Sequence, residues 1–247
     1  TKGEPEHWRN TISAFFYCTH SAAPIIHIAG QRPVKVVGVE GLFNARMARM
    51  GARAGNMAVE LVTLENGGIF KSIHGVGPSK NSVWYSVYGA KGRMETARED
   101  AECDNTVYAN LDEVEGITEN TVVSYIPESE FKEKIESFGH GGSDYICLYN
   151  AFEHLLGNPD ADIIDVYEAT DMFLPGYFAY QSILDGSKSQ EIRDLRNKEE
   201  REKWRNDTAC CDPKVAGDML WPTMSAGTPD IPMEVYAYMA QLWAEEC

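Results

Sequence analysis

The sequence is poor in positive charge and lacks long apolar runs. Its 247 residues carry 22 basic against 38 acidic side chains, a formal net charge of −16. Most of such a surface repels a phosphate backbone or an anionic membrane, which argues against nucleic acid as a partner. No apolar run approaches the roughly 20 residues of a membrane-spanning helix. The first ten residues also lack the basic and then apolar order of a signal peptide, so we expect a soluble, cytoplasmic protein with no membrane partner.

Regular cysteine spacing is missing as well. The six cysteines form no C-x-x-C pair and no pattern typical of a disulfide framework or a zinc site. We therefore expect reduced thiols and no bound metal. Metal-dependent hydrolysis by Cys18, His20 and His140 has suitable ligand types, but it lacks ligand spacing.

A hydrophobic content of 43% is ample for a core, so we expect a folded globular protein. The patterns of apolar residues along the chain favour an α+β domain. Apolar residues at helical spacing predict a helix over 8–29, which Pro24 would kink. β-Branched residues predict a strand over 32–41. Between 58 and 96 the pattern is a meander, in which "NGG" (66–68) is a strong hairpin signal. We expect an open, mainly antiparallel sheet of at least four strands, with helices on one face and the other face exposed or covered by a partner.

The second half of the chain has helical periodicity. A helix is expected from Ser143, as the N-cap, to Gly157. A second helical segment is expected over 164–186, interrupted at Pro175 and Gly176. Residues 205–247 are expected to form an irregular C-terminal extension with a last short helix near 233–245. The whole chain, 1–247, is expected to be a single domain.

Two histidines stand out from the other four by their neighbours. His20 lies beside several small polar groups, whereas His140 lies in "FGHGGSDY", a glycine-rich entry to a helix. Glycines allow close backbone approach, and a helix N-terminus presents free N–H donors to an oxygen-rich ligand. These residue types alone leave a purely structural role open for both histidines.

Four segments follow one another in a recognisable order: "YCTHSAAPIIHIAGQRPVKVVGVEG", the meander, "GHGGSDY" and "DVYEATDMFLPGYFAYQSILDG". This order resembles the C-terminal domain of the Gfo/Idh/MocA oxidoreductases, and the resemblance covers most of residues 4–200. The chain is most similar to the branch of NAD-dependent glycosidases and sugar-oxidising relatives, which carry T-H-x-x-x-P and H-G-G-x-D segments. The resemblance implies an α+β substrate-binding domain that forms homo-oligomers through its sheet face.

The resemblance also implies roles for particular residues. His20 matches the histidine that contacts the sugar hydroxyl being oxidised. Many members place an aspartate four residues earlier, where this chain has Phe16, so Tyr17 is the expected hydroxyl partner. The remaining contacts with the sugar fall on His140, Asp144, Trp8 and Arg9.

The family binds NAD or NADP in a Rossmann domain, whose G-x-G-x-x-G turn joins a strand to a helix. The chain lacks this fingerprint, because "HGVGPSK" (74–80) lies inside the meander. We therefore expect the substrate part of an NAD(P)-dependent sugar or glycoside oxidoreductase, which uses a Rossmann domain from outside this chain. Net oxidation of a ring hydroxyl and redox-neutral glycosidic cleavage both stay open. The alternative is a non-catalytic carbohydrate-binding or assembly module.

Overall fold

A computed structural model describes residues 3–44, 47–48, 51–55, 57–75, 84–98, 106–111, 121–135 and 137–246. The chain divides into two compact units. The first is formed by Thr1–Ser79 together with Val166–Cys247, and the second by Lys80–Asp165. That residues 1–247 act as a single domain stays a prediction.

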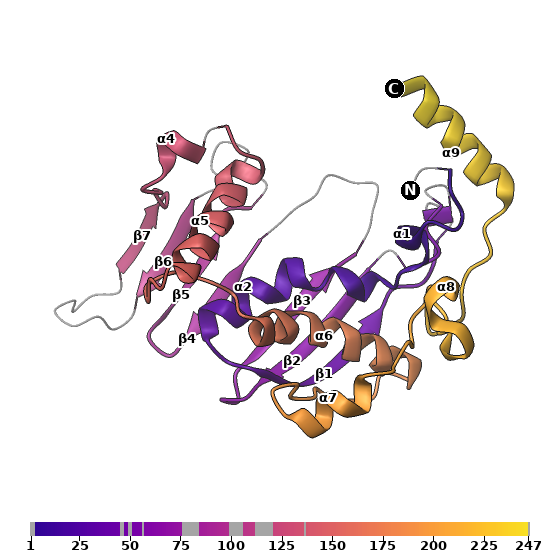
Figure 1. Cartoon of the computed structure of the whole chain (residues 1–247), viewed down its shortest axis with the longest axis horizontal. Coiled ribbons are helices and arrows are strands. Elements are labelled where there is room, and N and C mark those ends of the chain that lie inside the picture. The colour runs from indigo at the N-terminus through magenta and orange to yellow at the C-terminus, as the bar shows by residue number, and fades with distance from the viewer. Residues whose placement is uncertain are drawn as a thin grey trace. The chain divides into compact units, whose positions relative to one another are not determined.

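The first unit is built on a four-stranded antiparallel sheet with the order β3-β2-β1-β8 (Figure 1). The sequence predicts its first strand and its hairpin correctly, and Gly67 in the "NGG" turn has the positive φ, 83°, that such a turn requires. The strands of this sheet are β1 (Pro33–Glu40), β2 (Ala58–Leu64), β3 (Ile69–His74) and β8 (Gln190–Glu191).

The single helix expected over 8–29 is wrong. The chain forms three pieces instead: α1 (Trp8–Thr11), the 3₁₀ helix η1 (Ala14–Tyr17) and α2 (Thr19–Ala29). The break occurs because Ile12 is extended and the Ser13 hydroxyl accepts from the amide of Phe15, which starts a new helical turn. Pro24 is accommodated inside α2, and Gly30 ends that helix in the left-handed conformation, as predicted.

Helix α6 (Val166–Leu184) runs continuously through Pro175 and Gly176, so the expected interruption is also wrong. At Gly176 the backbone of α6 lies close to Cys18, since a Cβ there would be 2.5 Å from the Cys18 sulfur. Figure 1 shows α2 and α6 side by side across one face of the sheet. The absence of a side chain therefore lets these helices pack closely, and the helix keeps its direction.

The two faces of this sheet differ in burial, as expected for a sheet with helices on one face. In β2 every second residue from Ala58 to Leu64 is buried. The face away from the helices exposes large apolar side chains, namely Val39, Leu61, Ile69 and Ile73. We call these four residues the open sheet face.

The second unit contains a separate antiparallel sheet with the order β4-β5-β6-β7. The four strands expected over 58–96 all form and are antiparallel, but the described residues place them in two sheets: β2 and β3 belong to the sheet of β1, whereas the two strands that follow belong to the second sheet. The strands of the second sheet are β4 (Ser86–Gly89), β5 (Gly92–Thr96), β6 (Val107–Leu111) and β7 (Thr121–Tyr125).

Two helices and a 3₁₀ turn complete the described part of the second unit: α4 (Lys132–Ile135), η2 (His140–Gly142) and α5 (Ser143–Leu155). The N-cap of α5 is Gly142, not Ser143 as expected. Gly142 is left-handed with φ 92°, and the Ser143 hydroxyl donates to the carbonyl oxygen of His140 (2.8 Å). The serine hydroxyl thus donates to a carbonyl oxygen in the turn before the helix and does not cap a helical amide.

The C-terminal part of the first unit contains α7 (Lys198–Trp204), α8 (Pro213–Ala216), the 3₁₀ turn η3 (Gly217–Met219) and α9 (Met233–Glu246). The last helix begins where the sequence predicts it. The four cysteines in the described ranges, Cys18, Cys147, Cys210 and Cys211, are free thiols. Within those ranges, none of the helices combines the length and the hydropathy that a membrane span requires.

Candidate functional site

The junction between η1 and α2 is anchored by a buried cysteine. The Cys18 thiol has no exposed surface, and its sulfur donates to the carbonyl oxygens of Met172 (3.7 Å) and Phe173 (3.6 Å) in α6. Burial raises the pKa of Cys18, and the nearby carboxyl of Glu60 raises it further. The thiol therefore stays protonated and packs the helices together, as a structural cysteine does.

Tyr17 and His20 lie together at this junction. Their rings stack with centroids 6.2 Å apart and planes at 20°. His20 is exposed and Tyr17 is half-buried. An imidazole and a phenol can each exchange a proton with a hydroxyl group, so this pair can serve a reaction at an alcohol.

Phe16 lies four residues before His20, the position at which the resemblance leads one to expect an aspartate. Its ring stacks on Phe173 at 6.2 Å and meets the edge of Tyr180 at 5.7 Å. The residue therefore belongs to the aromatic packing between η1 and α6.

Trp8 and Arg9 form a second local pair in α1. The Arg9 guanidinium lies 5.0 Å from the centroid of the Trp8 ring, which is half exposed. His7 caps this short helix, because its Nδ1 accepts from the amide of Arg9 (3.2 Å). The cation over the indole face fixes the relative orientation of the two side chains.

Trp8 lines an open cavity of about 520 Å³. The cavity lies between the N-terminal segment, Gly3 to Trp8, and the start of α8 at Asp212 and Lys214. Three carboxylates and one lysine line it, from Glu4, Glu6, Asp212 and Lys214. Its negative balance suits a neutral or cationic ligand better than an anion.

His140 and Asp144 are brought together in the second unit. The His140 Nδ1 lies 3.0 and 3.1 Å from the two carboxylate oxygens of Asp144, and both side chains are largely exposed. His140 and the two glycines after it all have positive φ, which turns the chain sharply into α5. Asp144 lies in the first turn of that helix, where a carboxylate is favoured.

A buried glutamate is a feature that the sequence-based site prediction missed. Glu60 of β2 has no exposed surface, and neither carboxyl oxygen has a hydrogen-bond partner of standard geometry among the described residues. Burial raises its pKa to about 8, an effect that the Ser72 hydroxyl partly offsets. The signal was present in the sequence, because Glu60 shares its face of the strand with Ala58 and Val62.

Polar groups surround Glu60 beneath η1 and α2. Ser72 is its cross-strand neighbour, and its hydroxyl lies 2.5 Å from that of Ser21. His74 follows on the same face, and its Nδ1 lies 2.9 Å from the carbonyl oxygen of Ala14, whereas its buried Nε2 has no partner within the described ranges. Burial lowers the pKa of His74, so the ring is neutral and donates from Nδ1.

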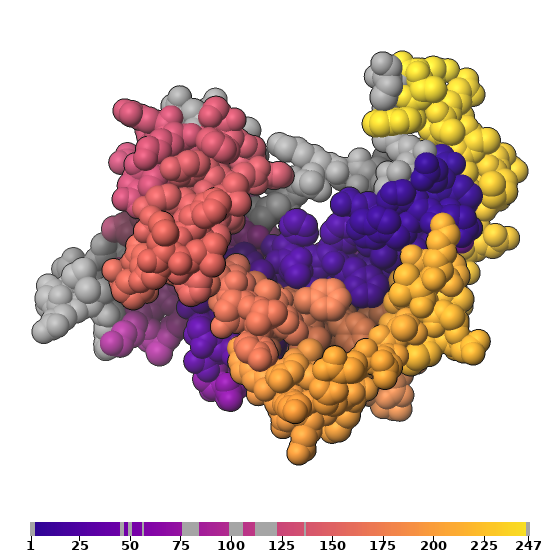
Figure 2. Space-filling view, in the orientation of Figure 1, coloured from indigo at the N-terminus to yellow at the C-terminus, as the bar shows by residue number. Residues whose placement is uncertain are grey.

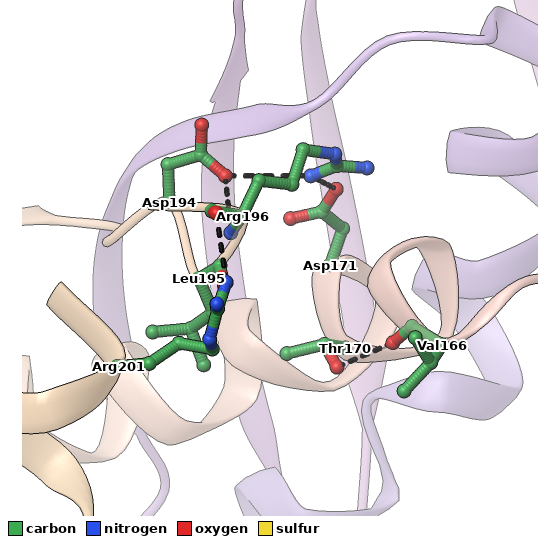
Figure 3. Close-up of polar contacts among 7 residues, drawn as sticks. All are labelled: Val166, Thr170, Asp171, Asp194, Leu195, Arg196 and Arg201. Carbon is green, nitrogen blue, oxygen red and sulfur yellow. Dashed lines mark hydrogen bonds and ion pairs between the residues drawn. The ribbon is translucent and has the colours of Figure 1, made fainter. Parts of the chain in front are cut away.

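A polar network joins α6 to the segment after β8 (Figure 3). The Arg196 guanidinium donates to the buried carboxylate of Asp171 at 2.6 Å and lies 3.5 Å from Asp194. Arg201 donates to the carbonyl oxygens of Leu195 and Arg196, both at 2.7 Å. Burial raises the pKa of Asp171 and the hydrogen bond from Arg196 opposes that rise. The network is structural, because its buried charge is paired.

The predicted site residues thus form three local pairs: Tyr17 with His20, Trp8 with Arg9, and His140 with Asp144. The first two pairs belong to the first unit and the third to the second unit. Within the described ranges, no three histidine, cysteine or acidic side chains gather as ligands for a metal ion.

The sequence matches no family model and no curated protein. The fold, however, matches solved structures of NAD-binding oxidoreductases. Levoglucosan dehydrogenase in complex with NADH and L-sorbose is 11% identical, with a TM-score of 0.58 over 78% of this chain and 56% of that one. An NAD-binding oxidoreductase from Klebsiella pneumoniae is 10% identical, with a TM-score of 0.58 over 77% of this chain and 55% of that one.

A third structure, an oxidoreductase domain protein from Kribbella flavida, is 15% identical with a TM-score of 0.51. At such identities the likeness concerns the fold. This chain thus shares its fold with part of these solved NAD-binding oxidoreductases. The chain spans little more than half the length of the structures it matches.

Proposed function

We propose that this chain is the substrate-binding and oligomerisation part of an NAD(P)-dependent sugar or glycoside oxidoreductase. The observation that carries the proposal is the stacked pair of Tyr17 and His20 at the start of α2, on a fold that matches NAD-binding oxidoreductases. Levoglucosan dehydrogenase was solved with levoglucosan and with L-sorbose, which supports a sugar as the substrate class.

In the proposed chemistry, residues of this chain remove the proton of the sugar hydroxyl. Oxidation of a ring hydroxyl removes a hydride from carbon and a proton from oxygen. His20 accepts that proton, and Tyr17 orients the hydroxyl through its phenol. Oxidation also acidifies the neighbouring C–H, so elimination of an aglycone can use the same site. Net oxidation and redox-neutral cleavage are therefore both compatible with these two residues.

The remaining predicted residues bind the sugar in this proposal. The indole of Trp8 offers an apolar face to a sugar ring, and Arg9 offers hydrogen-bond donors beside it. His140 and Asp144 offer a donor and acceptor pair at the glycine-rich turn. Each of these four residues is exposed enough to meet a ligand.

The dinucleotide itself does not fit the described residues. It needs a strand, a glycine-rich turn and a helix in a parallel sheet, whereas both sheets here are antiparallel. Most of the segment 74–80, which contains a G-x-G sequence, lies outside the described residues. In the proposed function, a Rossmann domain from outside this chain binds NAD or NADP. The oxidised dinucleotide would be the hydride acceptor.

The test uses this chain and the full product of its gene, with NADH binding measured by calorimetry and sugar oxidation by the absorbance of NADH formed. We expect dinucleotide binding only where a Rossmann domain is present. His20→Gln is expected to lower the rate of oxidation about 10²- to 10⁴-fold, the usual contribution of a general base, with unchanged NADH affinity.

His27→Gln is the matched control, because His27 is an exposed histidine of the same helix, 2.6 Å from Glu168. Equal activity of the two variants would contradict the role of His20. Absence of NADH binding to either protein would favour the non-catalytic carbohydrate-binding or assembly module.

Oligomerisation through the open sheet face has its own test. Leu61→Glu places a charge on this face, where 55% of the leucine side chain is exposed, and burial of that charge in an interface would be costly. We expect light scattering to show a homo-oligomer for the wild type and a monomer for Leu61→Glu. Ile28→Glu, an exposed site on α2, is the control. A monomeric wild type would refute this interface.

A further inference from the structure

A second cavity, of about 210 Å³, lies on the first unit between α6 and the end of α7. Figure 2 shows the orange surface of the segment that contains α7 beside the salmon surface of α6. None of Tyr17, His20, Trp8 and Arg9 lines this cavity. Its lining residues therefore differ from those of the two candidate pairs in the first unit.

The apolar wall of this cavity consists of aromatic rings on two helices. Phe173 and Tyr177 lie one turn apart on α6, so their rings share a side of the helix. Trp204, the last residue of α7, meets Tyr177 edge to face with centroids 5.9 Å apart. Phe173 is 40% exposed, so ring surface is available to a ligand. Such surfaces bind a partner with an apolar face.

The polar edge of the cavity carries one charge of each sign, from Arg193 and Asp207. The Asp207 carboxylate is held in place by two donors, the amide of Ala209 (2.8 Å) and the Tyr177 hydroxyl (3.3 Å). Burial and the charge of Asp207 raise the pKa of Tyr177 to about 12, so this phenol remains a donor. Each carboxylate oxygen retains acceptor capacity for a ligand, and the guanidinium offers several donors.

We propose that this cavity binds a single sugar ring. A pyranose combines one apolar C–H face with hydroxyl groups around its edge. Because the planes of Trp204 and Tyr177 are nearly perpendicular, the C–H face lies on one of these rings and meets the edge of the other, and the hydroxyls fit the Asp207 carboxylate and the Arg193 guanidinium. Drug-sized ligands occupy pockets of about 300–1,000 Å³, so a cavity of about 210 Å³ suits a smaller ligand.

The chemistry of the lining disfavours other ligand classes. A purely apolar ring would cover two ionised groups without replacing their hydrogen bonds to water, which costs free energy. The two charges cancel locally, and the chain carries a net charge of −16, so the electrostatic potential at the site does not favour an anion such as a nucleotide. A neutral ligand that both donates and accepts is the class that remains.

The proposal goes beyond the function proposed above, because it needs neither a dinucleotide nor His20. We would titrate the full chain with methyl α-D-glucopyranoside without cofactor, and follow the indole N–H signals by NMR. The Trp204 signal is assigned by comparison with Trp204→Phe. We expect it to shift with a dissociation constant in the millimolar range, as suits about a dozen non-hydrogen atoms.

Asp207→Asn and Arg193→Met are each expected to weaken this binding about fivefold or more, because hydrogen bonds to charged groups are the stronger ones. Arg205→Met, an exposed arginine that pairs with Glu202, is the matched control and should leave binding unchanged. His20→Gln should also leave it unchanged, which separates this cavity from the proposed substrate site.

Three outcomes would overturn the proposal. The first is absence of a saturable shift at Trp204. The second is equal affinity in the wild type, Asp207→Asn and Arg193→Met. The third is tighter binding of indole than of the glucoside, because that would show an apolar site. Circular dichroism of each variant confirms that it is folded.

Discussion

Replacement of Arg196 with methionine is expected to lower the free energy of unfolding by about 2–3 kcal/mol. Its guanidinium donates at 2.6 Å to Asp171, whose side chain is 4% exposed. Loss of one partner from a buried ion pair costs about 3–5 kcal/mol, because the other charge stays buried without compensation. Arg196 is itself 42% exposed, so water screens part of the pair and the expected loss is smaller.

The measurement is the urea midpoint and slope at neutral pH for the wild type and Arg196→Met. Methionine keeps most of the apolar stem but removes the guanidinium, which also lies 5.4 Å from the centroid of the Tyr167 ring, so the loss includes a cation–π contact. Arg205→Met is again the control. Its pair with Glu202 is largely exposed, so water screens it and its loss should change stability little. Equal losses in the two variants would show that the Asp171 pair contributes no more than a surface ion pair.

This pair illustrates a limit of sequence-based reasoning. The run from Ser189 to Asp207 alternates in charge and predicts a solvated face. Lys203 and Arg205 fit that description, because both are largely exposed and each pairs with an acid of α7 three residues earlier. Arg196 has the same residue type but reaches a buried acid 25 positions away. The composition of the run contains no signal for that difference.

The elements of the fold that depend on local patterns could be predicted. The strand over 32–41, the hairpin at "NGG" and the last helix all follow from periodicity and turn chemistry. Some errors are local, such as the helix break at Ile12 and Ser13. Others arose where tertiary contacts decide the outcome. One example is the edge strand β8, which pairs with β1 from more than a hundred residues further along the chain.

Gly176 is another such error. Proline and glycine together are typical of a helix end, but the helix continues, because Gly176 is needed for contact with Cys18 and Phe15. The tertiary contact thus explains the glycine better than the local signal does.

The candidate site shows the same division. Tyr17 with His20, Trp8 with Arg9, and His140 with Asp144 are local pairs, so their spacing made them predictable. The cavity beside Trp204 is lined by α6, the segment after β8, the end of α7 and the residues that follow it. No local sequence pattern predicts it. Glu60 was detectable from its position on the buried side of a strand. What the sequence could not show is that, among the described residues, neither of its carboxyl oxygens has a hydrogen-bond partner of standard geometry.

Glu60→Gln is expected to stabilise the chain, and the gain should grow with pH. The pKa of Glu60 rises from its ordinary 4.5 to about 8 in the folded state. Below pH 4.5 the carboxyl is protonated in both states, so it adds no pH dependence. Between 4.5 and about 8 the unfolded chain releases this proton and the folded chain keeps it, so stability falls as pH rises. The limiting slope is about 1.4 kcal/mol per pH unit.

Glutamine has nearly the same shape and no proton to lose in this range, so the variant escapes that decline. We therefore expect urea midpoints of the wild type and Glu60→Gln to diverge from pH 5 to pH 8 and to run parallel above it. The difference at pH 8 should reach a few kcal/mol relative to the difference at pH 5. Any unsatisfied amide of the new glutamine shifts the whole curve but not its slope, since an amide does not titrate.

Glu65→Gln is the control for this pH series, because Glu65 is an exposed carboxyl just beyond the same strand. Its midpoints should follow those of the wild type at every pH. A gap between Glu60→Gln and the wild type that stays constant with pH would mean that Glu60 is ionised in the folded state. In that case a cation or water beside its carboxyl oxygens would have to stabilise the charge, because a buried carboxylate is costly without such compensation.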